Sequence, residues 1–501
     1  MSDSASRQKG SPPSDRRPDS GGDTCRRVTS RTRRARDVVA RDLFPLDESS
    51  ARAATLAVLA VVAAVVAVMR LGSEGMNTVW AEDGQVFYAG AKDASLPHVF
   101  FHTYRGYMHA APRVIAAIDA LFPVKWAASS IAISDAVALG LLAAVVYRAS
   151  QAHIQRPWLR VIPALLVAAC PVGQETFGAI ANLQWSMFFV AFAVLLWNPQ
   201  RPVPIAVGAV TVAFATLSSP FGLLLVPIAV VRALVFQRNR AAVIPLCTLA
   251  GVGIQALIMA YAGGRQSYYT VLVGKLTRLF IAGVTGQGFF GARYQAAWMA
   301  LGTVVVIAVG AAWALIAVMG LPRQFAVTSL ALIYSLGYFA APVVLSGMSV
   351  WQGTRYFVGP LLLIVFAVVI LLDGALSLQN RFRWTGSCRP AAVILCTGLL
   401  ACVGYAAVTS WRTPDLSRAT PTWPAALAAA RTHCSHGASS ATLPITPVSP
   451  LRWRVVLSCS QIRDRVTRPR TRAGQGIRHR TGASSHCTGT SAEAQAWCPR
   501  P

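Results

Sequence analysis

The chain contains apolar runs that are too long for the core of a soluble domain. The first run, Ala54–Leu71, has the sequence ATLAVLAVVAAVVAVMRL, and comparable runs recur along the chain. A helix of about 20 apolar residues crosses a hydrocarbon core of roughly 30 Å. Lipid offers no hydrogen-bond partners to backbone N–H and C=O groups, so only helices and closed β-barrels span a membrane. These runs do not alternate apolar with polar residues, as the strands of a membrane barrel do. They therefore predict transmembrane helices.

We expect an all-α polytopic membrane protein with about eleven transmembrane helices, two of them short. The composition agrees, because 54% of the 501 residues are hydrophobic and 13% are charged. The expected helices are Ala54–Leu71, Trp126–Tyr147, Val161–Val172, Ile180–Trp197, Val203–Leu217, Phe221–Phe236, Ala242–Ala262, Ala296–Met319, Gln324–Leu345, Phe357–Leu372 and Ala391–Ser410.

The formal net charge of +27 alone suggests a nucleic-acid partner, but its distribution favours a membrane protein. Arginine is concentrated before Arg52, after Trp411 and in short connections, as the positive-inside rule expects. We therefore expect a multi-pass plasma membrane protein with a cytoplasmic N-terminus, an extracytoplasmic C-terminus and no nucleic-acid partner. The inner connections then carry Arg148, Arg156, Arg160, Arg201, Arg238, Arg240, Arg323, Arg381, Arg383 and Arg389.

Composition divides the chain into four parts. We expect a disordered basic cytoplasmic tail (1–52), a transmembrane domain (53–410) whose first outer loop is 72–125, a small extracytoplasmic segment (411–464) and a disordered basic tail (465–501). The ten cysteines show no metal-ligand spacing. Cys434 and Cys459 lie in the outer segment, where an oxidising environment favours a disulfide between them.

Acidic residues collect on the outer side of this topology, and the densest group is Glu82 and Asp83 in VWAEDGQVFYAGA. Carboxylates at a membrane edge are functional candidates by default. One of them can act as a general base toward a hydroxyl, or the pair can hold a divalent cation that neutralises a phosphate. The alternative is a solvated helix start that is stabilised by the helix dipole.

The stretch FHTYRGYMHAAPR places aromatic, histidine and arginine side chains together in the same outer loop. Arg105 and Arg113 are candidate phosphate ligands, and Tyr104 or Tyr107 can stack on a sugar ring. Tyr107 and His109 are candidate substrate-binding residues. The alternative is an interfacial amphipathic helix with an aromatic belt.

A second polar group, GQETFGAIANLQWSMFF, joins two apolar runs at the outer side and carries Glu175, Asn182, Gln184 and Trp185. If the turn is helical, Glu175 and Asn182 are two turns apart and share a face. Such a cluster can orient an acceptor sugar, although hydrogen bonds between helices are the alternative role for Asn and Gln.

Arg265 and Arg355 lie on the outer side, against the positive-inside bias, and Tyr356 follows Arg355. We expect an anionic partner for these arginines. A lipid phosphate of a bound donor is one such partner, and lipid headgroups in general are the alternative.

The order of these motifs resembles the GT-C superfamily of polytopic membrane glycosyltransferases. The resemblance rests on WAEDG in a long first loop, on Glu175 to Trp185 and on TRYF at Thr354–Phe357, and it covers roughly Ala54–Ser410. It implies a sugar donor linked to polyprenyl phosphate, Asp83 as the base with Glu82 as its neighbour or substitute, and phosphate binding by Arg355 and Arg265. A clear DxD motif is missing, which leaves the use of a divalent cation open.

The expected function is therefore that of a hexosyl- or pentosyltransferase acting on an envelope glycan or glycolipid at the outer membrane face. Two rival functions share the same outer features. One is a lipid-linked sugar transporter or flippase, whose coupling acids normally lie near the middle of the membrane. The other is a polysaccharide polymerase or ligase with the same basic clamp.

Overall fold

The computed structural model describes residue 34 and residues 36–47, 52–93, 102–236, 240–262, 273–346, 353–378, 385–411, 422–446 and 453–463. The chain divides into two units, Met1–Asp464 and Arg465–Pro501, and every described residue belongs to the first. Arg265, most of the expected N-terminal tail and all of the expected C-terminal tail lie outside the described residues.

A helix occupies each of the eleven predicted apolar runs. These helices are α2 (Ala53–Met76), α6 (Ala127–Ser150), α7 (Pro157–Ala169), α8 (Leu183–Leu196), α9 (Pro202–Ser218), α10 (Val226–Val235), α11 (Val243–Tyr261), α14 (Trp298–Val318), α15 (Pro322–Ser346), α16 (Val358–Ser377) and α17 (Thr385–Thr409). Within the described residues, seven helical segments are long and apolar enough to cross a membrane. The four shorter ones, of 10–17 residues, correspond to α7, α8, α9 and α10.

Short elements connect these helices. They include the π-helical turn η1 (Asp83–Tyr88), α3 (Ala89–Asp93), α5 (Ala110–Asp119), α12 (Val273–Leu279), the π-helical turn η7 (Phe280–Gln287), α13 (Gly288–Phe290) and the 3₁₀ turn η10 (Thr354–Phe357).

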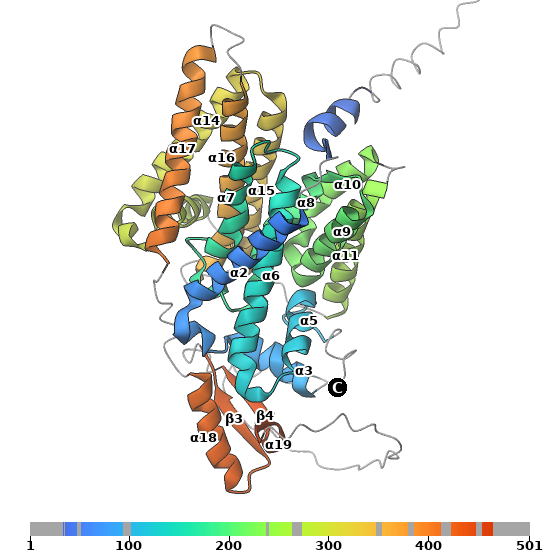
Figure 1. Cartoon of the computed structure of the whole chain (residues 1–501), viewed down its shortest axis with the longest axis vertical. Coiled ribbons are helices and arrows are strands. Elements are labelled where there is room, and N and C mark those ends of the chain that lie inside the picture. Colours follow the sequence, from blue (N-terminus) through green and yellow to red (C-terminus); the bar gives the residue numbers. More distant parts are fainter. Residues whose placement is uncertain are drawn as a thin grey trace, which may run out of the picture. The chain divides into compact units, whose positions relative to one another are not determined.

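Helices α16 and α8 lie at the centre of the bundle and are buried on all sides. Helix α16 packs against α15, α17, α7 and α8 (Figure 1). Both sequences are apolar around the whole helix, which is the pattern of a helix with no solvent-facing side. The core therefore fixes the position of the first turn of α8, which carries Trp185. It also fixes the η10 turn that precedes α16.

Small residues allow the helices to approach closely. Helix α2 lies along α6 (Figure 1), and a Cβ on Gly140 of α6 would be 2.3 Å from the backbone oxygen of Ala60. Close backbone approach at small residues is typical of helix packing within membranes.

In the expected topology Asp135 and Asp373 are the two acids of residues 53–410 that do not lie on the outer side, and both have structural partners. Asp373 accepts hydrogen bonds from the backbone N–H of Gln155 at 2.8 Å and from Arg156 at 2.9 Å. Asp135 accepts one from the backbone N–H of Gly178 at 2.7 Å. These contacts fix the connections between helices.

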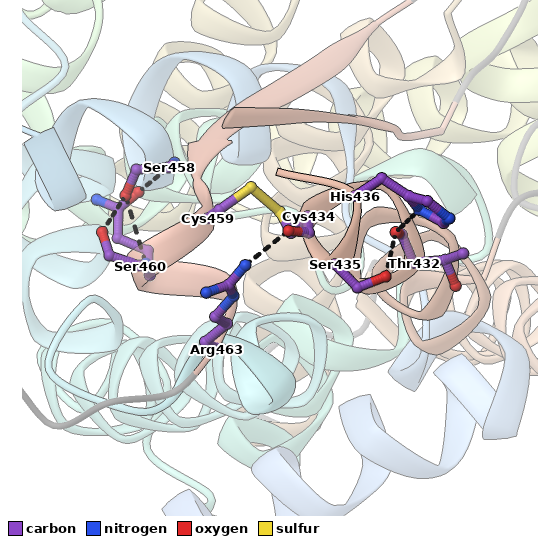
Figure 2. The surroundings of a disulfide bond; sticks show 9 residues. Thr432, Cys434, Ser435, His436, Ser458, Cys459, Ser460 and Arg463 are labelled. Atoms are coloured by element: carbon purple, nitrogen blue, oxygen red, sulfur yellow. Dashed lines mark hydrogen bonds between the residues drawn. A yellow bond between two sulfur atoms is a disulfide. The ribbon is translucent and has the colours of Figure 1, made fainter. Parts of the chain in front are cut away.

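The C-terminal residues 422–446 and 453–463 form what we call the C-terminal module. Helix α18 (Trp423–Ser435) packs on β3 (Ser440–Pro444), which pairs antiparallel with β4 (Arg454–Ser458) before the short helix α19 (Cys459–Ile462). The predicted disulfide between Cys434 and Cys459 is confirmed and joins α18 to α19 (Figure 2). Arg463 also donates to the carbonyl oxygen of Cys434 at 2.6 Å.

Candidate functional site

The two acids of WAEDG lie in different environments. Asp83 begins the π-helical turn η1 and is fully buried, whereas Glu82 precedes the turn and is half-buried. Turns of this wide kind are rare and occur frequently at functional sites. The structure thus separates two residues that are chemically almost equivalent in the sequence.

Asp83 faces the protein interior. Its Oδ1 accepts a hydrogen bond from the backbone N–H of Ala181 at 2.8 Å, which ties the first loop to the connection before α8. Asp135 binds the same connection at Gly178. The two buried carboxylates therefore bind the first and the last residue of the stretch 178–181.

Glu82 lies within electrostatic range of the aromatic and basic residues that the sequence singled out. Burial raises the pKa of both Tyr104 and Tyr107, and the negative charge of Glu82 raises both further. The pKa of Arg105 is raised, first by the adjacent Tyr104, whose ring centre is 5.8 Å from the guanidinium carbon, and to a smaller extent by Glu82. Arg355 is also within electrostatic range of Glu82.

Tyr104 to Tyr107 form a tight hairpin that presents Arg105. The backbone N–H of each tyrosine donates to the carbonyl oxygen of the other, at 3.1 and 3.2 Å. The two central residues have positive φ, 55° at Arg105 and 80° at Gly106, as in a type I′ turn. A left-handed conformation costs a non-glycine residue about 1–2 kcal/mol. Such strain clusters at functional sites, and here it leaves Arg105 exposed.

Glu175 and Arg355 join two stretches that lie far apart in the sequence. Glu175 Oε1 accepts from the backbone N–H of Arg355 at 2.9 Å, and its Oε2 is 3.4 Å from Arg355 Nη1. A Cβ on Gly353 would be 3.1 Å from Glu175 Oε1, so glycine fits this close approach. The predicted phosphate ligand Arg355 is therefore oriented by a protein carboxylate.

The connection between Glu175 and Asn182 is not a continuous helix, because it contains two separate 3₁₀ turns, Gln174–Thr176 and Ile180–Asn182. The two residues meet nevertheless, since Asn182 Nδ2 donates to the backbone oxygen of Glu175 at 3.1 Å. Asn182 Oδ1 accepts from Trp185 Nε1 at 3.3 Å, and the Trp185 ring packs edge-on against Tyr356 at 4.9 Å.

The structure adds residues that the sequence analysis did not select. Tyr338 of α15 stacks on Phe188 at 3.7 Å, and its hydroxyl donates to the backbone oxygen of Gln184 at 3.3 Å. Arg70, at the end of the first apolar run, donates to Gln174 Oε1 at 2.9 Å. The signal for Arg70 was a charge inside an apolar run, whereas nothing in the sequence distinguished Tyr338 from other buried aromatic residues.

An apolar groove of about 380 Å³ lies between α10 and α15 and reaches Tyr338. It is lined by Leu43, Leu224, Pro227, Ile228, Val231, Leu330, Ile333, Tyr334, Gly337 and Tyr338. The ring of Tyr338 also lies 6.0 Å from that of Trp185, measured between ring centres. One layer of aromatic side chains therefore separates this groove from Asn182, to which Trp185 is hydrogen-bonded.

The predicted site residues of the described chain thus fall into one region. Glu82 lies within electrostatic range of Arg105, Tyr107 and Arg355. His109 stacks on Tyr107, with 3.9 Å between ring centres. The adjoining wall is formed by Glu175, Asn182, Gln184, Trp185 and Tyr356. Asp83 faces away into the core. Among the described residues, no group of three or more His, Cys, Asp or Glu could hold a metal ion.

The chain matches no protein-family model, no curated protein and no solved structure. Any functional conclusion therefore rests on the geometry of the region around Glu82 and on the chemistry of its side chains.

Proposed function

We propose that this chain is a membrane glycosyltransferase that moves a sugar from a polyprenyl-phosphate donor to a hydroxyl of an envelope glycan or glycolipid. The observation that carries the proposal is the placement of Glu82. It is a half-buried carboxylate within electrostatic range of Arg105 and Arg355. The same polar region adjoins an apolar groove through Tyr338.

In this proposal Glu82 is the general base. It removes the proton of the acceptor hydroxyl while that oxygen bonds to the anomeric carbon of the donor sugar. The bond between the anomeric carbon and the phosphate oxygen breaks, and the phosphate leaves with the electron pair. Asp83 is the less suitable base, because it is fully buried and one of its oxygens already accepts from Ala181.

The leaving phosphate is stabilised by Arg355 and Arg105. A guanidinium presents a fixed fork of donors that fits phosphate oxygens. Glu175 supports this role, since it binds both the backbone N–H and the side chain of Arg355 and so fixes its orientation. The groove along α15 accepts the apolar chain of the donor. A divalent cation at the phosphate remains compatible with this scheme and is not needed for its steps.

The proposal includes an orientation. All eleven helices cross the plasma membrane, the N-terminus is cytoplasmic, and the region around Glu82 faces outward. Lipid-linked donors suit this location, because the energy for transfer is carried by the lipid phosphate ester. A transporter of lipid-linked sugars would share the groove but would form no new glycosidic bond.

The test uses purified protein in nanodiscs with a glycosylated polyprenyl phosphate and an octyl glycoside acceptor. Positioned general-base catalysis contributes on the order of 10²–10⁴ in rate. Glu82→Gln should lower transfer by about that range and keep the melting temperature. Asp83→Asn should instead lower the melting temperature, because it disturbs the buried bond to Ala181.

Transfer by Glu82→Gln at the parent rate would reject Glu82 as the base. If Asp83→Asn keeps its melting temperature and loses the activity, the base is Asp83. If the parent protein moves the lipid across the bilayer without forming a glycosidic bond, the transporter function replaces the transferase.

A further inference from the structure

Residues 107–109 bring together the buried polar side chains of His109, Gln184 and Gln255 around Tyr107, which is within electrostatic range of Glu82. The ring of His109 stacks on that of Tyr107, with 3.9 Å between ring centres. The side chain of Gln184 lies close to the Tyr107 hydroxyl. Gln255, from the middle of α11, accepts from the backbone N–H of Met108 at 3.2 Å. Three segments that are distant in sequence, the residue before α5, the start of α8 and the middle of α11, thus contribute side chains here.

Each of these three side chains keeps a buried polar atom with no hydrogen-bond partner among the described residues. The atoms are His109 Nδ1, Gln184 Oε1 and Gln255 Nε2. The residues are 3%, 8% and 3% exposed. Buried polar atoms are nearly always paired, and leaving one unpaired costs about 1–3 kcal/mol. Three in one place indicate a polar ligand.

The group is uncharged. Burial and the positive charge of Arg113 lower the pKa of His109 to about 3, so its imidazole is neutral at physiological pH. The two glutamine amides do not ionise. The atoms therefore combine at least one acceptor, Gln184 Oε1, with one donor, Gln255 Nε2, and an imidazole nitrogen whose role depends on its tautomer.

A neutral ring with several hydroxyl groups matches this set. Each hydroxyl both donates and accepts, and the apolar face of a sugar packs against aromatic rings such as Tyr107 and Tyr104. Tyr104 lies 5.5 Å from His109 between ring centres. The three side chains carry no charge of their own, and the charge beside them is that of the buried Arg113, so a cationic headgroup is disfavoured here.

We propose that His109, Gln184 and Gln255 form a subsite that holds a neutral sugar ring beside Glu82. The inference rests on the proposed transferase function, and it assigns a role to Gln255 and separates sugar binding from phosphate binding. The ring belongs either to the donor or to the acceptor, and both sources present the same hydroxyl chemistry.

The experiment compares two synthetic lipids, farnesyl phosphate and its hexosyl phosphodiester, whose sugar ring is uncharged, by equilibrium binding to full-length protein in nanodiscs. His109→Phe keeps the ring stack and removes Nδ1, and Gln255→Met keeps the length of the side chain and removes Nε2 together with the Oε1 that accepts from Met108. Thr328→Val is the matched control, because its buried hydroxyl also lacks a partner among the described residues. It lies ten positions before Tyr338 on α15, roughly 15 Å along the helix.

For a donor ring, both test variants should bind the hexosyl phosphodiester about three- to tenfold more weakly and bind farnesyl phosphate like the parent, in line with one lost hydrogen bond. For an acceptor ring, binding of both lipids stays unchanged and the KM for an octyl glycoside rises by the same factor. Thr328→Val should change neither quantity.

The subsite is rejected if His109→Phe and Gln255→Met, at the parent melting temperature, bind both lipids and use the acceptor as the parent does. The subsite is also rejected if the variants bind both lipids more weakly by the same factor, since the residues would then act only on the fold. A parent protein that binds neither lipid and transfers no sugar is a different result, because it removes the proposed function itself.

Discussion

The backbone N–H of Ala81 donates to the carbonyl oxygen of Thr446 at 2.6 Å, which binds the residue before Glu82 to the C-terminal module. Thr446 in turn donates to the carbonyl oxygen of Val79 at 3.2 Å. On the other side, Trp423 Nε1 donates to the carbonyl oxygen of Val124 at 2.8 Å. The position of Glu82 therefore depends on a segment that follows the last apolar helix.

The disulfide should keep this arrangement in place. Cys434 and Cys459 are 25 residues apart, and closing a loop of this size stabilises a fold by about 3 kcal/mol. Replacing both cysteines with serine should raise hydrogen exchange in the module and at Ala81, and should lower sugar transfer.

Hydrogen exchange read by mass spectrometry tests this effect. Cys402→Ser is the control, since Cys402 is a half-buried free cysteine of α17. Faster exchange confined to the module, with Ala81 protected as in the parent, would mean that the disulfide does not support Glu82.

The stability of the protein should fall when a single methyl group is added at Gly84. A Cβ there would lie 2.7 Å from Ile445 Cδ1, 2.7 Å from Val79 Cγ1 and 2.9 Å from Val455 Cγ2. These side-chain ends must shift, and overpacking of this kind costs about 1–3 kcal/mol. Gly84→Ala should therefore lower the melting temperature of the purified protein.

Gly90 provides the matched control for Gly84. It lies in α3 of the same loop, and nothing is within 4 Å of an added Cβ. Gly90→Ala should be neutral or stabilising by up to about 1 kcal/mol, because alanine favours a helix. Equal effects of the two substitutions would contradict close packing between Gly84 and the module.

Much of the fold could be predicted from the sequence, because long apolar runs have few alternatives to helices. All eleven runs contain a helix, and the disulfide joins the two cysteines for which it was predicted. The lengths were harder to predict. Helix α10 begins only at Val226, because residues Pro220–Leu225 form a 3₁₀ turn. The contact between Gly84 and the module was not predictable, since nothing in either stretch identifies its partner.

The site was predicted as a set of residues but not as an arrangement. Glu82 and Asp83 differ by one methylene, and only the π-helical turn at Asp83 separates a buried carboxylate from a half-buried one. The pair of Arg355 with Glu175 required the two stretches to meet in space. Gln255 was missed because a single glutamine in an apolar helix has many structural roles.

Stability should fall in acid through His109. Its folded pKa of about 3 lies below the ordinary value of 6.5, so the unfolded chain binds the proton more readily. The stabilising contribution is complete above pH 6.5 and is lost as the pH falls toward 3. At pH 5 the loss is about 2 kcal/mol, from 1.36 kcal/mol per pH step below 6.5.

Melting temperatures at pH 7.5 and pH 5 measure this loss. His109→Phe should lose less stability between the two values than the parent does. His436→Phe, at an exposed position in the C-terminal module, should retain the full acid sensitivity. Identical acid sensitivity of His109→Phe and the parent would show that other groups govern this transition.

The orientation is tested by two cysteines at exposed positions. Ala425 lies in α18 of the C-terminal module, and Gln200 lies between α8 and α9. The positive-inside rule places the connection with Arg201 in the cytoplasm and the module outside. In a chain whose cysteines outside the disulfide are serine, a membrane-impermeant maleimide should label Ala425→Cys in intact cells and Gln200→Cys only after lysis. The reverse pattern would place Glu82 on the cytoplasmic face, where nucleotide sugars are available and the argument for a lipid-linked donor loses its basis.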